Sequence, residues 1–224
     1  METSFIQWLN VIAFDWVHRC GKWTQIKLTQ NYLKEKGYEV VIIRWEGSRN
    51  WTGDDEVYFD PKSWYFSHFS QTKIHLGHEH WLEASNRIQR ELLYWRKQFQ
   101  KNNKNWSKLI VLTDRSILSR FMLYRQMYTN IDLASLLFLQ DSRKVSIPNI
   151  IFVFSAEVNI LLQRIEPNDP KWAFRRRNIE TNVPILESIL DDLPHQIRSI
   201  TCEIFCGNKT PNDIFQEIKA RLPL

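Results

Sequence analysis

Hydrophobic residues in this chain alternate between short continuous runs, typical of buried strands, and longer stretches with helical spacing. The first run covers residues 5–14, and a polar loop and a helix-forming segment at residues 25–36 follow it. Gly37 is positioned to end that helix, and the β-branched run at residues 40–43 comes next. Two strands joined by a helix within ~35 residues predict a right-handed parallel crossover. The chain therefore begins as an α/β protein.

The same alternation continues to the end of the chain. Three further strands are expected, at residues 109–112, 149–154 and 200–205. Helical spacing recurs in five segments, at residues 81–100, 117–138, 156–165, 179–193 and 213–222. Residues 45–73, with scattered glycines, serines and a proline, are expected to be irregular. The pattern predicts a single domain over residues 1–224, with a five-stranded parallel sheet and helices on both faces.

Composition narrows the class of protein. With 224 residues, of which 43% are hydrophobic and 25% charged, the chain can bury one substantial core. The net charge of +5 favours an anionic ligand, but acids are interleaved with the bases, so a mononucleotide fits as well as a nucleic acid. No apolar run approaches the ~20 residues that cross a bilayer, and no signal peptide precedes the three cysteines. We expect a soluble, cytoplasmic protein without a membrane partner.

The first strand, loop and helix carry the strongest chemical signal. Residues 11–24 read VIAFDWVHRCGKWT. We interpret them as a strand, a loop and the start of a helix, which is the setting in which a phosphate-binding loop is found. Backbone N–H groups of such a loop surround phosphate oxygens, and a lysine adds a full positive charge. Gly21 and Lys22 match the last glycine and the lysine of G-x-x-x-x-G-K-[ST], whereas Trp16 and Trp23 replace the first glycine and the hydroxyl residue. The match to a phosphate loop is partial.

Charged residues also follow two later elements. Asp114 and Arg115 stand at the end of the third expected strand, so they are either crevice-facing ligand contacts or a structural ion pair. A basic run at residues 175–177 follows Pro167 and Pro170, and it is either a lid that closes over phosphates or a solvated charge run. Both places become candidates for binding an anion.

Metal and redox sites are weaker hypotheses. His75, His78 and His80 follow the spacing H-x-x-H-x-H, which lacks a clear fourth ligand, so a surface helix start is the preferred interpretation. Cys202 and Cys206 are interpreted as a buried strand residue and a turn residue.

Five segments, in the right order, resemble the thymidylate kinase branch of the P-loop nucleoside monophosphate kinases. HRCGKWT stands where eukaryotic-type members have D-R-x-G-K-S-T, and VLTDRSILS is similar to their D-R-Y-x-x-S. Ala84-Ser85-Asn86-Arg87 is similar to the S-A-N-R or A-A-D-R helix segment. FVFSAEVNILLQRI resembles the strand and helix before the lid, and GNKTPNDIFQEIKARL resembles the C-terminal segment. Together these segments span nearly the whole chain.

The resemblance implies transfer of the γ-phosphoryl group of ATP to a deoxynucleoside monophosphate such as dTMP, with Mg²⁺. Lys22 would contact the β- and γ-phosphates, Arg19 would stabilise charge on the transferred group, and Asp114 would help to position magnesium. Gly21 and Thr24 would belong to the nucleotide-binding loop. These roles follow from the resemblance alone.

The resemblance also assigns a lid, an acceptor site and a plausible homodimer. The lid would lie at about residues 166–180, with Arg175 and Arg176 over the phosphates. Four residues would lie on the acceptor side: His18, Arg44, Arg87 and Arg115. Direct binding of nucleic acid is disfavoured, because no continuous stripe of aromatic and basic residues is present.

Several residues depart from the family pattern. His18 replaces the loop carboxylate that holds the acceptor sugar, and Ser116 replaces the tyrosine of D-R-Y. Trp16 brings a bulky side chain where the backbone folds tightly, and Trp23 removes a magnesium-binding hydroxyl. Thr24 points about 100° away on a helix and so does not simply replace it. These changes predict impaired use of ATP, with a pseudokinase that acts as a binding or scaffolding module as the alternative.

Overall fold

The computed structural model describes residues 10–16, 19–44, 108–127 and 147–222. The helix expected at residues 81–100, the irregular segment at 45–73 and the histidines between them lie outside the described residues. The side chains of Trp16 and Arg44 also lie outside them, although the backbone of both residues is placed in strands.

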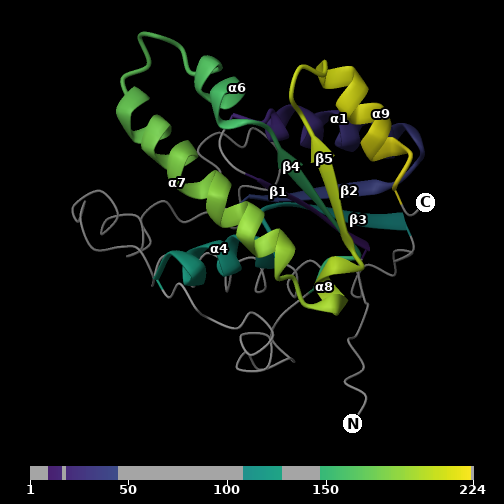
Figure 1. The fold of residues 1–224 in the computed structure, drawn as a ribbon. Helices are drawn as coiled ribbons and strands as arrows, with labels where there is room; N and C mark the ends of the chain where they lie inside the picture. Colours follow the sequence, from purple (N-terminus) through teal and green to yellow (C-terminus); the bar gives the residue numbers. More distant parts are fainter. Residues whose placement is uncertain (1–9, 17–18, 45–107, 128–146, 223–224) are drawn as a thin grey trace, which may run out of the picture.

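Five parallel strands form the centre of the molecule (Figure 1). They are β1 (Asn10–Trp16), β2 (Glu39–Arg44), β3 (Leu109–Asp114), β4 (Ile150–Ser155) and β5 (Thr201–Phe205). Their order in the sheet is β2-β3-β1-β4-β5, with every neighbouring pair parallel. The parallel five-stranded sheet expected from the sequence is confirmed. The chain passes from β1 to β2 and β3 on one side of the sheet, and then from β3 to β4 and β5 on the other side of β1. The carboxyl end of β1 therefore lies at a switch point, where open α/β sheets bind ligands.

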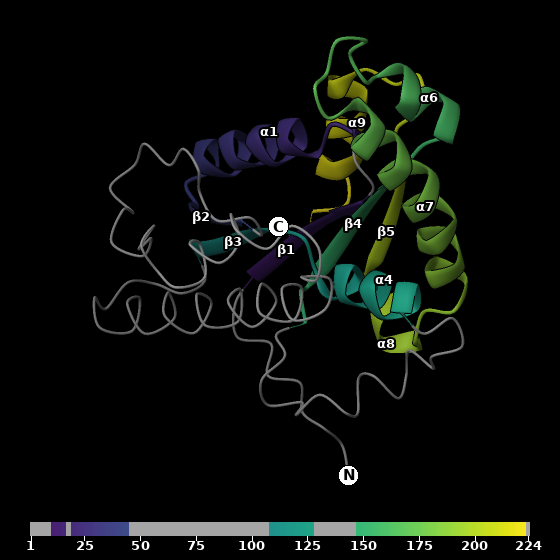
Figure 2. The ribbon, with the colours of Figure 1, turned by 90° about the vertical axis from the view of Figure 1, so that its left-hand side faces the viewer.

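Helices cover both faces of the sheet, as predicted. The described helices are α1 (Lys22–Glu35), α4 (Ile117–Met127), α6 (Val158–Gln163), α7 (Trp172–Asp191), α8 (His195–Arg198) and α9 (Pro211–Lys219). Figure 2 shows α1 on one side of the sheet and α4 on the other. Among these helices, none combines the length and the apolar character that crossing a bilayer requires.

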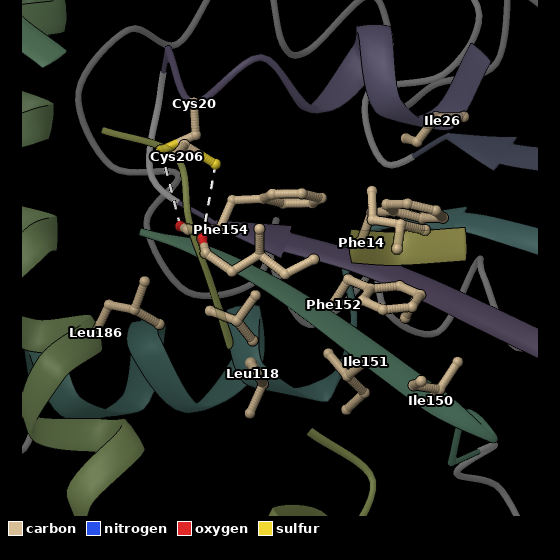
Figure 3. Packing of buried hydrophobic residues seen from close by; sticks show 14 of the residues in the cluster. Phe14, Cys20, Ile26, Leu118, Ile150, Ile151, Phe152, Phe154, Leu186 and Cys206 are labelled. Atoms are coloured by element: carbon tan, nitrogen blue, oxygen red, sulfur yellow. Dashed lines mark hydrogen bonds between the residues drawn. The ribbon is translucent and has the colours of Figure 1, made fainter. Parts of the chain in front are cut away.

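The core has two layers because side chains alternate along each strand. Phe14, Phe152 and Phe154 pack together on the α1 face, with centroid distances from Phe14 of 5.7 and 6.1 Å (Figure 3). On the opposite face Ile151 lies toward Leu118, and α7 adds further apolar side chains. Burial on both faces explains the near-continuous apolar runs in the sequence.

Gly37 ends α1 as predicted. Its φ of 82° is left-handed, and the amides of Gly37 and Tyr38 donate to the carbonyls of Lys34 and Leu33 at 2.9 and 3.0 Å. This pair of bonds is a Schellman motif, which satisfies the last carbonyls of the helix. The chain thus leaves α1 directly into β2.

Three expectations about boundaries are wrong. The helix expected to start at residue 25 begins at Lys22, so Lys22 is helical and does not lie in the loop. The first strand continues to Trp16, so this residue pairs with β4 in the sheet and does not stand in the turn. Helix α7 begins at Trp172, seven positions before the expected start at residue 179, so the basic run at 175–177 is helical. Pro184 lies inside this helix with an exposed side chain. The non-helical part of the expected lid is therefore short.

Candidate functional site

The described part of the turn between β1 and α1 contains two residues in the left-handed conformation. Arg19 and Gly21 both have positive φ, at 72° and 81°, and Gly21 is the N-cap of α1. A Cβ built on Gly21 would meet nothing within 4 Å, so there is room for a side chain at this position. Glycine is favoured here because of its left-handed backbone conformation. Left-handed residues that alternate with other conformations make successive N–H groups converge, and the helix N-terminus favours negative charge. The turn can therefore receive an anion.

Lys22 is the first residue of α1 and is buried, with 5% of its surface exposed. Its Nζ donates a hydrogen bond to Oδ1 of Asp114, the last residue of β3. Burial lowers the pKa of Lys22 to about 8, while the Asp114 carboxylate raises it and the Arg115 guanidinium lowers it. The ammonium remains mostly protonated at neutral pH. The structure thus brings Lys22, at the start of α1, into contact with Asp114, at the end of β3. Arg115 is the next residue after Asp114.

Asp15, which the sequence analysis did not identify as a site residue, has no exposed surface and lies against the residues that follow β3. Its Oδ2 accepts from the N–H and the hydroxyl of Ser116 at 2.8 and 2.6 Å, and from the N–H of Ser119 at 3.2 Å. Its Oδ1 accepts from the Ser119 hydroxyl at 2.8 Å. A carboxylate at the start of α4 also meets the positive end of the helix dipole. The signal in the sequence was an acid at the end of an apolar run.

Arg115 is held in place by its backbone and by Asp15. Its φ is 97°, a left-handed conformation, and its N–H donates to the carbonyl of Phe14 at 2.9 Å. Its Nη1 lies 3.7 Å from Oδ1 of Asp15. The turn between β3 and α4 is therefore fixed to β1, and the Arg115 guanidinium is held beside the buried carboxylate of Asp15.

A second group of charges connects the loop to α7. Oδ2 of Asp169 lies 2.7 Å from Nη2 of Arg19 and 3.0 Å from Nη1 of Arg175. Arg164 donates from Nη1 to the carbonyl of Arg19 at 3.2 Å, and from Nη2 to the carbonyls of Cys206 and Gly207 at 3.2 and 2.5 Å. The lid segment and the loop after β5 are thus tied to the phosphate loop.

Arg176 takes no part in this group. Its Nε donates to Oε1 of Glu180 at 2.8 Å, and its guanidinium lies 5.3 Å from the centre of the Trp172 ring. Of the two lid arginines predicted to contact phosphates, Arg175 therefore faces the loop and Arg176 lies along the helix.

Comparison with known proteins bears on the fold. No family model matches the chain, and no curated protein matches it. Among solved structures, thymidylate kinase from Candida albicans matches with a TM-score of 0.60 and 13% sequence identity, over 95% of this chain and 90% of that one. The chain has the thymidylate kinase fold. At this identity the likeness concerns architecture, and the chemistry depends on the residues of the site.

Trp23 and Thr24 are the second and third residues of α1. Trp23 is half-buried, packs against the core, and has Nζ of Lys27 5.3 Å from its ring centre. Thr24, one position further, is exposed on α1. The indole therefore occupies the position where members of the thymidylate kinase family carry a hydroxyl.

The described residues do not form a preassembled magnesium site. Mg²⁺ takes hard oxygen ligands in near-octahedral geometry. Asp114 is already bonded to Lys22, the oxygens of Asp15 accept four hydrogen bonds from serines, and Trp23 has no oxygen in its side chain. Within the described ranges, no three His, Cys, Asp or Glu residues are grouped so as to hold a metal ion. Asp114 as a magnesium ligand stays a prediction without support from this geometry.

Three predicted acceptor-side positions cannot be placed at the site. His18 and Arg87 lie outside the described residues, and the side chain of Arg44 does too, although Arg44 ends β2 beside Asp114 of β3. The described part of the candidate site is therefore the turn between β1 and α1, the contact of Arg19 with Asp169, and the pair Asp114 and Arg115 after β3.

Proposed function

We propose that this chain is a thymidylate kinase-like protein that binds the polyphosphate of a nucleotide at the turn between β1 and α1. The observation that carries the proposal is the gathering of four cations, from three parts of the chain, at the carboxyl end of β1: Arg19 and Lys22 where β1 passes into α1, Arg115 after β3, and Arg175 in α7. Guanidinium and ammonium groups beside a helix N-terminus suit the oxygens of a triphosphate, which would exchange with the carboxylates that pair with these cations in the free protein.

The associated reaction class is phosphoryl transfer from ATP to a deoxynucleoside monophosphate such as dTMP. Such transfer depends mostly on positioning and on neutralising charge. Lys22 would exchange its bond to Asp114 for a bond to a donor phosphate, and Arg19 would approach the transferred group. Arg115, fixed by Asp15, would contact the acceptor phosphate. Because no magnesium site is preassembled among the described residues, binding of the phosphates would rest first on the cations of the chain.

A second candidate function is a pseudokinase that binds nucleotide without turnover. One observation favours it, namely that the second residue of α1 is Trp23, so the hydroxyl expected at this position is missing. A protein of this kind would act as a binding or scaffolding module. The two candidates share the binding step and differ in the chemical step.

A thermal-shift titration with ATP, ADP and dTMP, each with and without Mg²⁺, tests the binding step. A ligand of the native state raises stability by mass action, by about 2.7 kcal/mol at 100 times Kd. For a domain of this size we expect ATP to raise Tm by roughly 5–10 °C, with or without the metal. Lys22→Met should abolish the shift, whereas Lys34→Met, an exposed lysine of the same helix, should preserve it. No shift with any nucleotide would contradict the proposal.

A coupled kinase assay separates the two candidates. The kinase reading predicts slow formation of dTDP by the wild-type chain, and a faster rate in Trp23→Ser, which restores the hydroxyl. The pseudokinase reading predicts no product from either protein, although ATP binds to both.

A further inference from the structure

One oxygen of Asp169 occupies the position at which two candidate phosphate-binding arginines meet. Arg19 comes from the phosphate loop and Arg175 from the first turn of α7, and both direct a terminal nitrogen at Oδ2 of Asp169. An oxyanion that receives two guanidinium donors has the arrangement these side chains would offer to a phosphate oxygen. The carboxylate is therefore a chemical stand-in for such a group.

Asp169 is built into the turn that precedes α7. Its Oδ1 accepts from the N–H of Lys171 at 2.9 Å, and its carbonyl accepts from the N–H of Trp172 at 2.8 Å. The side chain is only 7% exposed, whereas Arg19 and Arg175 are 26% and 31% exposed. The backbone around Lys171 and Trp172 therefore holds a nearly buried carboxylate, whereas both arginines keep part of their surface in solvent.

The binding capacity of Arg19 is not used up by this contact. Its Nη2 is bonded to Asp169, but its buried Nε has no hydrogen-bond partner within the part of the chain that the structure describes. A buried N–H without a partner costs free energy that a ligand oxygen can recover. The group formed by Arg19, Asp169 and Arg175 is thus incompletely satisfied.

We propose that Asp169 is a resident competitor of phosphate. It neutralises Arg19 and Arg175 while the site is free, and the terminal group of a polyphosphate displaces it. This inference rests on the proposed function and deepens it, because it names the residue that sets the affinity of the site. A terminal phosphoryl group carries about twice the charge of a carboxylate and three acceptor oxygens, so it can replace Asp169 at both arginines.

Calorimetric titration with inorganic tripolyphosphate tests the competition. Asp169→Asn removes the charge and keeps an oxygen that can accept from Lys171 N–H. Asp192→Asn is the matched control, because Asp192 also pairs with one arginine, Arg125 at 3.0 Å, but caps the far end of the same helix. The 20 residues of α7 separate the two ends of the helix, which Figure 1 shows as one long element, by ~30 Å.

We expect Asp169→Asn to bind tripolyphosphate at least fivefold more tightly than the wild-type chain, with Asp192→Asn within twofold. Unchanged or weaker binding in a folded Asp169→Asn protein would overturn the inference and leave the proposed function standing, provided that the wild-type chain binds. If neither protein binds, both fail. Asp169→Ser, whose hydroxyl can also accept from Lys171 N–H, is the second neutral variant and must show the same tightening if the asparagine variant does not fold.

Discussion

Two buried charges of opposite sign hold the candidate site. Asp15 is compensated by four hydrogen bonds from serines and by Arg115. Lys22 has its pKa lowered to about 8 by burial and is bonded to Asp114. Because desolvation of a charge is costly, each residue depends on partners that lie elsewhere in the chain.

Removal of the Asp15 carboxylate tests the first of these charges. Asp15→Ala leaves buried donors of Ser116 and Ser119 without their acceptor, so we expect a loss of about 3–5 kcal/mol in the free energy of unfolding. Urea denaturation measures it, with Glu187→Ala, an exposed position on α7, changing by less than about 0.5 kcal/mol. A loss below about 1 kcal/mol would mean that Asp15 does not anchor this corner.

The buried thiol of Cys206 should make the free energy of unfolding depend on pH in the alkaline range. Burial raises the pKa of its thiol from 9.0 to about 12, with opposing contributions from Arg164 and Lys209. The folded state therefore retains a proton that the unfolded state loses, so the contribution is fully present below pH 9 and is lost as pH rises toward 12. Between pH 8 and pH 10, the stability of the wild-type chain relative to Cys206→Ala should fall by about 1.4 kcal/mol. Urea denaturation at both pH values checks this, and a constant difference would contradict it.

The sequence identified those candidate site residues that stand directly at the end of a strand or at the start of a helix. Gly21 and Lys22 follow a strand and start a helix, and Asp114 ends another strand, so topology predicts where they lie. Asp15 and Asp169 were missed as site residues, because Ser116 stands 101 positions from Asp15 and Arg19 stands 150 positions from Asp169 along the chain. An isolated acid in an apolar run or a loop carries no sign of which distant donors will satisfy it.

At the scale of elements, the sequence predicted well the boundaries that a single residue or a short apolar run specifies. Gly37 ends α1 and the β-branched runs form strands, because backbone conformation and burial are local properties. The start of α7 was wrong, since the prolines before it read as a longer loop. In the structure, the amides of Lys171 and Trp172 are satisfied by Asp169, which allows the helix to begin early.

The capping box of α9 gives a prediction at this scale. The Thr210 hydroxyl accepts from the N–H of Asp213, and the Asp213 carboxylate accepts from the N–H of Thr210. We expect Thr210→Ala to lower the free energy of unfolding by about 1 kcal/mol, as loss of an N-cap does. Thr210→Ser, which keeps the hydroxyl, should stay within about 0.5 kcal/mol in the same urea experiment. Equal losses in both variants would show that the hydroxyl is not the stabilising group.

At the scale of the whole molecule, the sheet order explains why the site lies where it does. The alternation of strands and helices predicted a parallel sheet, but several strand orders are compatible with that pattern. The observed order puts β1 between β3 and β4, so Lys22, Arg115 and the segment after β4 meet at one edge. Packing between distant segments determines this order, and a single sequence does not display it.

The central claim is that the main-chain amides between β1 and α1 bind phosphate. The most direct measurement is a nitrogen–proton NMR titration of the isotope-labelled chain with ATP. We predict saturable downfield shifts of the Gly21 and Lys22 amides, with the same midpoint, because these N–H groups would donate to phosphate oxygens. Lys22→Met should lose them at equal nucleotide concentration. Saturation by ATP without any change at these two amides would contradict the account.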